Sequence, residues 1–287
     1  MGSMSDLYLG VDFGLSNTDI ALVQNGELQG QWSLHGVGPA RLETLWQAVQ
    51  WSGVRLEGLK GLATTGGLYR TLPEALEGIP VVKVGEAQAL GRGGLAMAGL
   101  SQALVVSAGT GSAMVVARNQ TAHHFTGSAV GGGTLLGLAK LLLGISDPLE
   151  LAQLAEQGDP GGVDSTLWDV IGSGIGHLPA SATAVNFGRI LSLSEPPKRE
   201  DIAAGLVTLV AQVIGMISLN AAKAAGMPQI VIVGHLPDLA PIRAAFERVW
   251  QFYSVEPRPI IPERSGWATA FGAALEAWGK EQRGTIS

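Results

Sequence analysis

Cysteine is absent from the 287 residues of this chain, which excludes disulfide bonds, cysteine metal sites and a cysteine nucleophile. Positive charge is scarce: 18 Lys and Arg stand against 24 Asp and Glu, the formal net charge is −6, and no basic run occurs. Because nucleic-acid binding depends on clustered cations that neutralise phosphates, we expect no nucleic acid as a main partner.

Long apolar runs are lacking as well. No stretch approaches the ~20 uninterrupted apolar residues that a membrane span needs, and the apolar patch at 134–145 is short and contains Lys140. We take residues 1–3 as a cloning remnant and Met4 as the natural start, after which nothing is typical of a signal peptide. The sequence therefore predicts a cytoplasmic protein without a membrane segment.

Apolar residues and glycine are present in excess. Hydrophobic residues make up 46% of the chain and charged residues 15%, which excludes a disordered protein. The 41 glycines are not a low-complexity tract but gather near the ends of apolar runs, for example at 66–67, 109–111 and 131–133. Glycines in such places are typical of tight turns or close approaches of the backbone.

The order of the apolar runs predicts two α/β lobes, each opening with a β-meander whose first turn contains glycine. This weak internal repeat places an N-terminal lobe at 4–101 and a C-terminal lobe at 102–279, around a cleft. The expected strands are 7–11, 19–23, 27–33, 58–65, 81–84, 103–107, 112–117, 122–125, 229–233 and 259–261, and the expected helices are 41–52, 87–98, 131–143, 147–156, 200–226, 239–250 and 267–278.

Two details of the helices follow from residue type. Asp147 is expected to cap the helix that begins at Pro148, and Gly226 to end the long helix. The long helix at 200–226 is apolar on most faces, which indicates burial, often at a subunit interface.

The first candidate site is the turn at 12–18, between the first two strands. Asp12 is suited to hold Mg²⁺ through water, while the backbone of Gly14 and the side chains of Ser16 and Asn17 are suited to approach a phosphate. A hairpin rich in turn-forming residues has the same sequence, so this motif is weak by itself.

Two further glycine motifs follow in the second half. Gly109-Thr110-Gly111 allows backbone amides to approach anionic oxygens, although a plain hairpin turn has the same appearance. Gly131, Gly132 and Gly133 open a helix, where each glycine costs up to ~1 kcal/mol. Because free amides at a helix N-terminus bind phosphate, we favour a functional interpretation for these three glycines.

The fourth motif is Gly234-His235, after an apolar strand and before a helix, where it is suited to contact a nucleoside or to form a plain turn. The order of the four motifs resembles that of the phosphate and adenosine segments in the actin-like ATPase (ribonuclease H-like) kinases. Ligands of such α/β sheets bind at the carboxyl ends of strands, where these turns fall.

Longer segments make the resemblance specific. Residues 107–144, Thr65-Gly66-Gly67, residues 182–188 and residues 263–275, which include Gly266, resemble the type II pantothenate kinases. The resemblance runs from Leu7 to Trp278. It implies a two-lobed actin-like fold with a nucleotide cleft between the lobes. It also implies transfer of the γ-phosphate of ATP to pantothenate with Mg²⁺, and a homodimer joined through the helix at 200–226.

Three positions depart from the family pattern. Asp19 stands where the family has a Lys that contacts phosphate, Val84 where it has the catalytic Glu, and His124 where it has an Arg that holds the substrate. Glu86 lies two residues beyond Val84, and either serves as the base or merely caps its helix. His123 and His124 are adjacent on a strand, so at most one faces the cleft.

The predicted site follows from these matches. Glu86 and Asp12 are the catalytic candidates, and Asp12 is also the metal candidate. An active kinase for pantothenate or a small hydroxylated relative is the main hypothesis. The alternative is a homologue without kinase activity that binds nucleotide or a ligand related to coenzyme A. The predicted substrate residues are Thr110, His124, Gly127 and Ser128, and the predicted nucleotide residues are Gly14, Ser16, Asn17, Gly109, Gly111, Gly131, Gly132, Gly133, Gly234 and Gly266.

Overall fold

The computed structural model describes residues 6–36, 38 and 40–284. Its first sheet is six-stranded, in the order β3-β2-β1-β4-β6-β5, with β1, β2 and β3 forming the expected meander. Helix α1 (Leu42–Ser52) packs on one face and α8 (Ala268–Gln282) on the other. The strands are β1 (Leu7–Phe13), β2 (Asn17–Gln24), β3 (Glu27–His35), β4 (Leu59–Gly66), β5 (Ala75–Leu76) and β6 (Ile79–Lys83).

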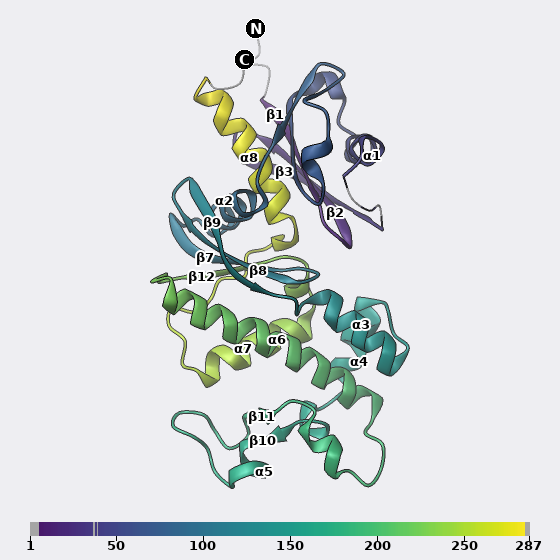
Figure 1. Ribbon diagram of the computed structural model, residues 1–287, viewed down its shortest axis with the longest axis vertical. Helices are drawn as coiled ribbons and strands as arrows, with labels where there is room; N and C mark the ends of the chain where they lie inside the picture. Colours follow the sequence, from purple (N-terminus) through teal and green to yellow (C-terminus); the bar gives the residue numbers. More distant parts are fainter. Residues whose placement is uncertain (1–5, 37, 39, 285–287) are drawn as a thin grey trace.

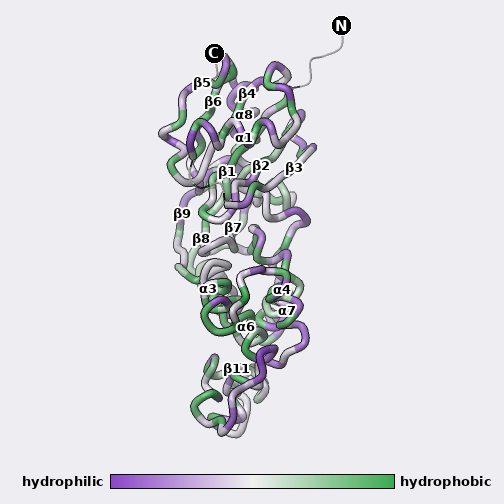
Figure 2. The backbone as a smooth tube through the Cα atoms, turned by 90° about the vertical axis from the view of Figure 1, so that its right-hand side faces the viewer, coloured by the Kyte–Doolittle hydropathy of each residue, from purple (hydrophilic) through white to green (hydrophobic). Residues whose placement is uncertain are grey.

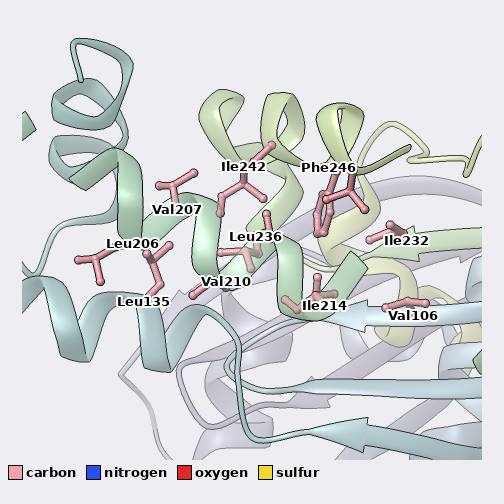
Figure 3. Close-up of a cluster of buried hydrophobic side chains, with 14 of the residues drawn as sticks. Val106, Leu135, Leu206, Val207, Val210, Ile214, Ile232, Leu236, Ile242 and Phe246 are labelled. Atoms are coloured by element: carbon pink, nitrogen blue, oxygen red, sulfur yellow. The ribbon is translucent and has the colours of Figure 1, made fainter. Parts of the chain in front are cut away.

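The second sheet is four-stranded, in the order β12-β7-β8-β9. One face packs on α3 (Gly132–Leu143), α6 (Arg199–Ala224) and α7 (Ala240–Phe252), and the other on α2 (Glu86–Ala98). Figure 3 shows the larger core on the first of these faces, where side chains of α6 and α7 meet those of the sheet. The strands are β7 (Gln102–Ala108), β8 (Ser112–Arg118), β9 (Thr121–Ser128) and β12 (Ile230–Val233).

The two sheets are joined by a crossing of α2 and α8, which lie between them (Figure 1). The crossing is close because each helix presents glycine. A Cβ atom on Gly93 would lie 1.7 Å from the carbonyl oxygen of Ala268, and one on Gly272 would lie 1.8 Å from that of Ala89. Glycine at these two positions therefore sets the spacing between the sheets.

A small excursion follows α4 (Pro148–Glu156) and lies at the end of the molecule away from the first sheet (Figure 1). The buried carboxylate of Asp164 organises it by accepting hydrogen bonds from the Phe187 amide at 2.8 Å and from Asn186 Nδ2 at 3.3 Å. The excursion contains η3 (Pro160–Gly162), β10 (Ser165–Thr166), α5 (Leu167–Ile171), β11 (Thr183–Val185) and η4 (Gly188–Ser192).

The two-lobed α/β architecture and most of the expected elements are confirmed. Asp147 caps α4 through the amides of Leu149 and Glu150, and Gly226 follows the long helix with a φ of 61°. The strand expected at 259–261 is wrong: among the described residues it is a single bridge between Ile260 and Val231. The first turn is also shorter than expected, since β1 continues to Phe13 and β2 begins at Asn17.

The division into lobes at 101/102 stays a prediction, and the last helix qualifies it. Although α8 lies at the end of the chain, it packs against β1, β2 and β4 of the first sheet. A Cβ atom on Gly10 of β1 would lie 2.0 Å from the carbonyl oxygen of Ala270. The C-terminal segment therefore completes the N-terminal lobe.

Helix α6 is half-buried and carries much of the second core. In Figure 2 the hydrophobic colouring is dense along α3 and α6, and the molecule is long and narrow. Within the described part of the chain, α6 is the one helix long and apolar enough to cross a membrane by length and composition, and 61% of that stretch is buried inside the protein. Buried core helices of globular proteins have the same length and composition, so the apolar composition of α6 follows from its packing.

Candidate active site

Two turns that contain glycine, one from each sheet, meet between the lobes. The first joins β1 to β2 and contains Gly14 and Ser16, and the second joins β7 to β8 and contains Gly109 to Gly111. The hydroxyl of Ser16 lies 2.9 Å from that of Thr110, 94 residues away in the sequence. Asn17 is fixed by a 2.8 Å hydrogen bond between its Oδ1 and His35 Nδ1. The structure thus brings the first two predicted motifs together.

The three glycines that precede and open α3 pack directly on the second turn. A Cβ atom on Gly131 would lie 2.7 Å from Gly111 Cα, and one on Gly133 would lie 2.7 Å from Thr110 Cγ2. The amide of Gly132 donates to Gly109 O and that of Gly133 to Thr110 O, each at 2.8 Å. The expectation that these two amides are free for phosphate is therefore wrong in this conformation. Glycine is needed here for close packing, and the nucleotide role of these residues stays a prediction.

A row of polar side chains crosses the first sheet at the level of the turn. Asp12 pairs with Asp19 on β2 and with Thr65 on β4, and Asp19 pairs with Ser33 on β3. Directly paired residues of neighbouring strands share one face of a sheet, so these four lie on the face that α8 covers. The Thr65 hydroxyl is buried without a hydrogen-bond partner among the described residues.

Burial dominates the electrostatics of Asp12. It raises the pKa of this carboxyl to about 8, and the negative charges of Asp19 and Glu86 act in the same direction, while the charge of His235 lowers it. Asp12, Asp19, Glu86 and His235 are therefore close enough to influence one another. A carboxylate that is costly to ionise in the free protein is one that a cation would stabilise.

His235 extends from the turn after β12 and contacts two carboxylates. Its Nε2 lies 3.0 Å from Asp19 Oδ1, across the two sheets, and its Nδ1 lies 3.3 Å from Asp238 Oδ2. Burial alone would lower the pKa of His235, but the hydrogen bonds and charges of Asp19 and Asp238 outweigh it and raise the pKa to about 10. Where the family has a Lys at position 19, this chain has Asp19, and the positive charge beside it comes from His235 of the opposite lobe.

The last two predicted nucleotide glycines surround this histidine. Gly234 has a φ of 106°, and its Cβ would lie 2.5 Å from Ala108 O. A Cβ atom on Gly266 would lie 2.3 Å from the His235 ring. Both positions require glycine for the close approach of the chain to its neighbours.

We expect the free energy of unfolding to fall as pH rises from about 6.5 to about 10. The pKa of His235 is raised from its ordinary 6.5 to about 10, so its stabilisation is complete below 6.5 and is lost as pH rises through the folded value. The raised pKa of Asp12 acts with the same sign between about 4 and 8. Urea unfolding in EDTA across this range measures the slope.

The matched control for this prediction is His123→Asn, because His123 is exposed on β9. His235→Gln should flatten the slope at the alkaline end, whereas His123→Asn should leave it unchanged. An identical slope in wild type and His235→Gln would contradict the assignment.

Val84 and Glu86 differ in environment. Val84 is 4% exposed and belongs to an apolar cluster with Ala63, Ala89 and Phe271. Glu86 is exposed at the first position of α2, and its charge acts on Asp12. Of the two, Glu86 is therefore the side chain that offers a carboxylate near Asp12.

The predicted substrate residues on β9 are divided between two faces. His124 pairs with Val115, which packs beneath α2, whereas His123 pairs with Val116 in the core on the opposite face. His124 therefore lies on the face of the second sheet that packs on α2, the helix that begins with Glu86. A Cβ atom on Gly127 would lie 2.6 Å from Ser112 O, and Ser128 Oγ accepts from the Val130 amide at 3.0 Å.

Sequence reasoning missed the Asp19–His235 contact and the row that contains Thr65. It recognised Asp19 only as a charge of the wrong sign and His235 only as part of a turn. A complementary pair of unusual charges, one just after each of two glycine motifs, was the available signal. The two residues lie 216 positions apart, so no local pattern connects them.

Comparison with known proteins decides the family. A family model described as Fumble matches residues 101–276. The chain belongs to the Fumble family. A type II pantothenate kinase of Oceanobacillus iheyensis is 29% identical over 94% of this chain and 99% of its own length. Pantothenate kinase 1 of rice (Oryza sativa subsp. japonica) is 41% identical over 138 residues, which are 46% of this chain but 20% of the rice protein.

Solved structures support the fold of this Fumble protein. The activator of the 2-hydroxyisocaproyl-CoA dehydratase from Clostridium difficile, with bound ADPNP, superposes with a TM-score of 0.68 at 19% identity and covers 98% of each chain. A ROK family glucokinase from Streptomyces griseus, in complex with glucose and AMPPNP, superposes with a TM-score of 0.53 at 16% identity, over 93% of this chain and 98% of its own. At these identities the likeness shows the actin-like fold alone.

Proposed function

We propose that this chain is an ATP-dependent kinase that phosphorylates pantothenate, the first step of coenzyme A biosynthesis. Family membership and the full-length similarity to a type II pantothenate kinase support the proposal. The observation that carries it is the meeting of two glycine-containing turns from separate sheets, with the hydroxyls of Ser16 and Thr110 2.9 Å apart. Phosphoryl transfer needs mainly positioning and charge stabilisation, which such turns provide.

The nucleotide would lie between the lobes. Its phosphates would contact the turns at Gly14 to Asn17 and at Gly109 to Gly111, and its nucleoside would lie near Gly234 and Gly266. Because the amides of Gly132 and Gly133 already donate to the second turn, Gly131 to Gly133 would act by fixing the shape of that turn.

The Asp12 carboxylate suits a Mg²⁺ ion that arrives together with ATP. Mg²⁺ keeps several waters and uses one or two carboxylates together with substrate phosphates, so it does not need a cluster of protein ligands. Among the described residues no group of three or more His, Asp or Glu is placed to hold a metal ion. The buried Asp12 carboxyl, with its pKa raised to about 8, is the one that a cation would favour in the ionised form. Mg²⁺ would supply charge neutralisation at the phosphates.

Glu86 would take the proton of the pantothenate hydroxyl as its oxygen bonds to the γ-phosphorus and the bond to the β-phosphate oxygen breaks. Glu86 is exposed at the start of α2, which permits contact with the hydroxyl. Val84 is buried and has no carboxylate. Thr110, His124, Gly127 and Ser128 would position the acceptor.

A homodimer in the cytoplasm, without membrane or nucleic acid as partner, completes the proposal. Helix α6 would lie at the contact between copies, with the excursion beside it. Two large apolar side chains of the excursion, Trp168 and Leu191, are 65% and 95% exposed and would be available for this contact. The molecular mass in solution, measured by light scattering, tests this part of the proposal.

The deciding experiment measures ADP release with Mg·ATP and pantothenate, together with the mass of the phosphorylated product. We expect turnover that depends on both substrates, because the turns and Glu86 are positioned for transfer. If ADP release does not respond to pantothenate but responds to another small hydroxylated compound, that compound would replace pantothenate as the proposed acceptor. The absence of ADP release with all acceptors would contradict the kinase function.

A second candidate is a homologue without kinase activity that binds nucleotide or a ligand related to coenzyme A. The burial of Val84 favours it, since no carboxylate occupies that place. It predicts measurable binding of ATP by calorimetry without turnover in the same assay.

A further inference from the structure

One ion pair crosses between the lobes beside the candidate nucleotide site. Asp19 lies on β2 of the first sheet, opposite Asp12, and His235 lies just after β12 of the second sheet. Their contact at 3.0 Å therefore connects the two walls of the cleft. Asp19 Oδ1 also accepts a hydrogen bond from the Ser33 hydroxyl, so two side chains contact this one oxygen.

The hydrogen bonds themselves set the charge of His235. Each ring nitrogen faces a carboxylate oxygen, of Asp19 on one side and Asp238 on the other. A neutral imidazole carries one N–H, whereas an ionised carboxylate only accepts. Both contacts are satisfied together by the imidazolium, which donates from both nitrogens.

The ring has little freedom to leave this position. It packs edge-on against Trp267, with ring centroids 5.0 Å apart, and Gly266 is so close to the ring that a Cβ atom there would lie 2.3 Å from it. The Trp267 indole N–H in turn donates to Trp32 O on β3 at 2.9 Å. His235 thus contacts the first lobe directly through Asp19 and indirectly through Trp267.

We propose that His235 is a positioning residue of the nucleotide site, which neutralises Asp19 and fixes the turn after β12 to β2 so that the two phosphate-facing turns keep their spacing. The inference rests on the proposed function in that a nucleotide occupies the cleft. Without the imidazolium, Asp19 would leave an uncompensated negative charge beside Asp12 and the anionic phosphates, and the lobes would lose this ionic contact. The acceptor side, near Glu86 and His124, would be affected less.

The test compares His235→Gln and Asp19→Asn with wild type. Gln removes the charge of the ring, and Asn keeps the shape of Asp19 while it removes the charge. We expect each variant to raise the ATP KM about tenfold or more and to leave the acceptor KM within about twofold. The Kd of a non-hydrolysable ATP analogue with Mg²⁺, measured by calorimetry, should rise by a similar factor. The double variant should bind about as well as the weaker single variant, because the pair acts together.

Arg258→Gln is the matched control, since it removes a surface charge whose partner, Glu256, is also exposed. It should leave both KM values unchanged. The inference is overturned if the two variants keep the wild-type Kd, or if the acceptor KM rises as much as the ATP KM, as in a general loss of structure. Because the Kd does not require turnover, a wild type that binds nucleotide but does not phosphorylate pantothenate would refute the proposed acceptor and leave this test intact. A wild type that binds no nucleotide would overturn both.

Discussion

Replacing Glu86 by glutamine is expected to lower kcat with pantothenate by a factor of about 10² to 10⁴, the usual contribution of a general base. Glutamine has nearly the same shape but does not accept the hydroxyl proton. Glu86 is exposed at the start of α2. The Tm should therefore change little, and steady-state ADP release measures the effect.

Glu43→Gln provides the control for this substitution. Glu43 is likewise exposed in the first turn of a helix, α1, so it reproduces the loss of charge near a helix N-terminus without the cleft. Its kcat should equal that of wild type. If Glu86→Gln retains full kcat, Glu86 only caps its helix and another group accepts the proton.

The elements of the fold were predictable because their signals are local. An apolar run followed by a glycine turn indicates a strand wherever it lies, and Asp147-Pro148 indicates a helix start from two adjacent residues. The strand expected at 259–261 failed for the same reason. Three apolar residues resemble a strand, but Ile260 finds only one bridge to Val231 because the chain turns away to form the loop before α8.

The candidate site was predictable in its location but not in its contacts. Glycine turns at strand ends indicated where a ligand binds, and Ser16 and Thr110 do meet there. The free amides expected at Gly132 and Gly133 instead donate to the neighbouring turn, since a glycine that allows a phosphate to approach equally allows another backbone to approach. The partner of Asp19 depended on how the lobes are placed, which no run of residues specifies.

The glycines of α2 and α8 were the least predictable feature. A glycine inside a helix normally indicates a local loss of about 1 kcal/mol. At Gly93 and Gly272 the missing side chain permits a close helix crossing that no other residue allows. This role depends on the packing of segments that are far apart in the sequence.

Replacing Gly272 by alanine should give the largest loss of stability of any substitution considered. The new Cβ would lie 1.8 Å from Ala89 O and 2.5 Å from Gly93 N, and both are backbone atoms that a rotamer change does not move. Helix α8 must shift away from α2, which loosens the contact between the sheets. We expect the free energy of unfolding in urea to fall by about 3 kcal/mol or more, at the upper end of the range for overpacking.

Gly279→Ala tests whether this loss comes from the crossing rather than from alanine itself. Gly279 lies on the same helix, and its Cβ would meet only the flexible Arg283 guanidinium, at 3.5 Å. Alanine there should raise the free energy of unfolding by about 0.5 to 1 kcal/mol through helix propensity. The two variants should thus differ in sign. Equal stability of Gly272→Ala and Gly279→Ala would mean that α2 and α8 do not cross at this glycine, and that the sheets are held apart by other contacts. Because the crossing also sets the distance between the two turns that we propose contact the phosphates, Gly272→Ala should weaken ATP binding, while Gly279→Ala should not.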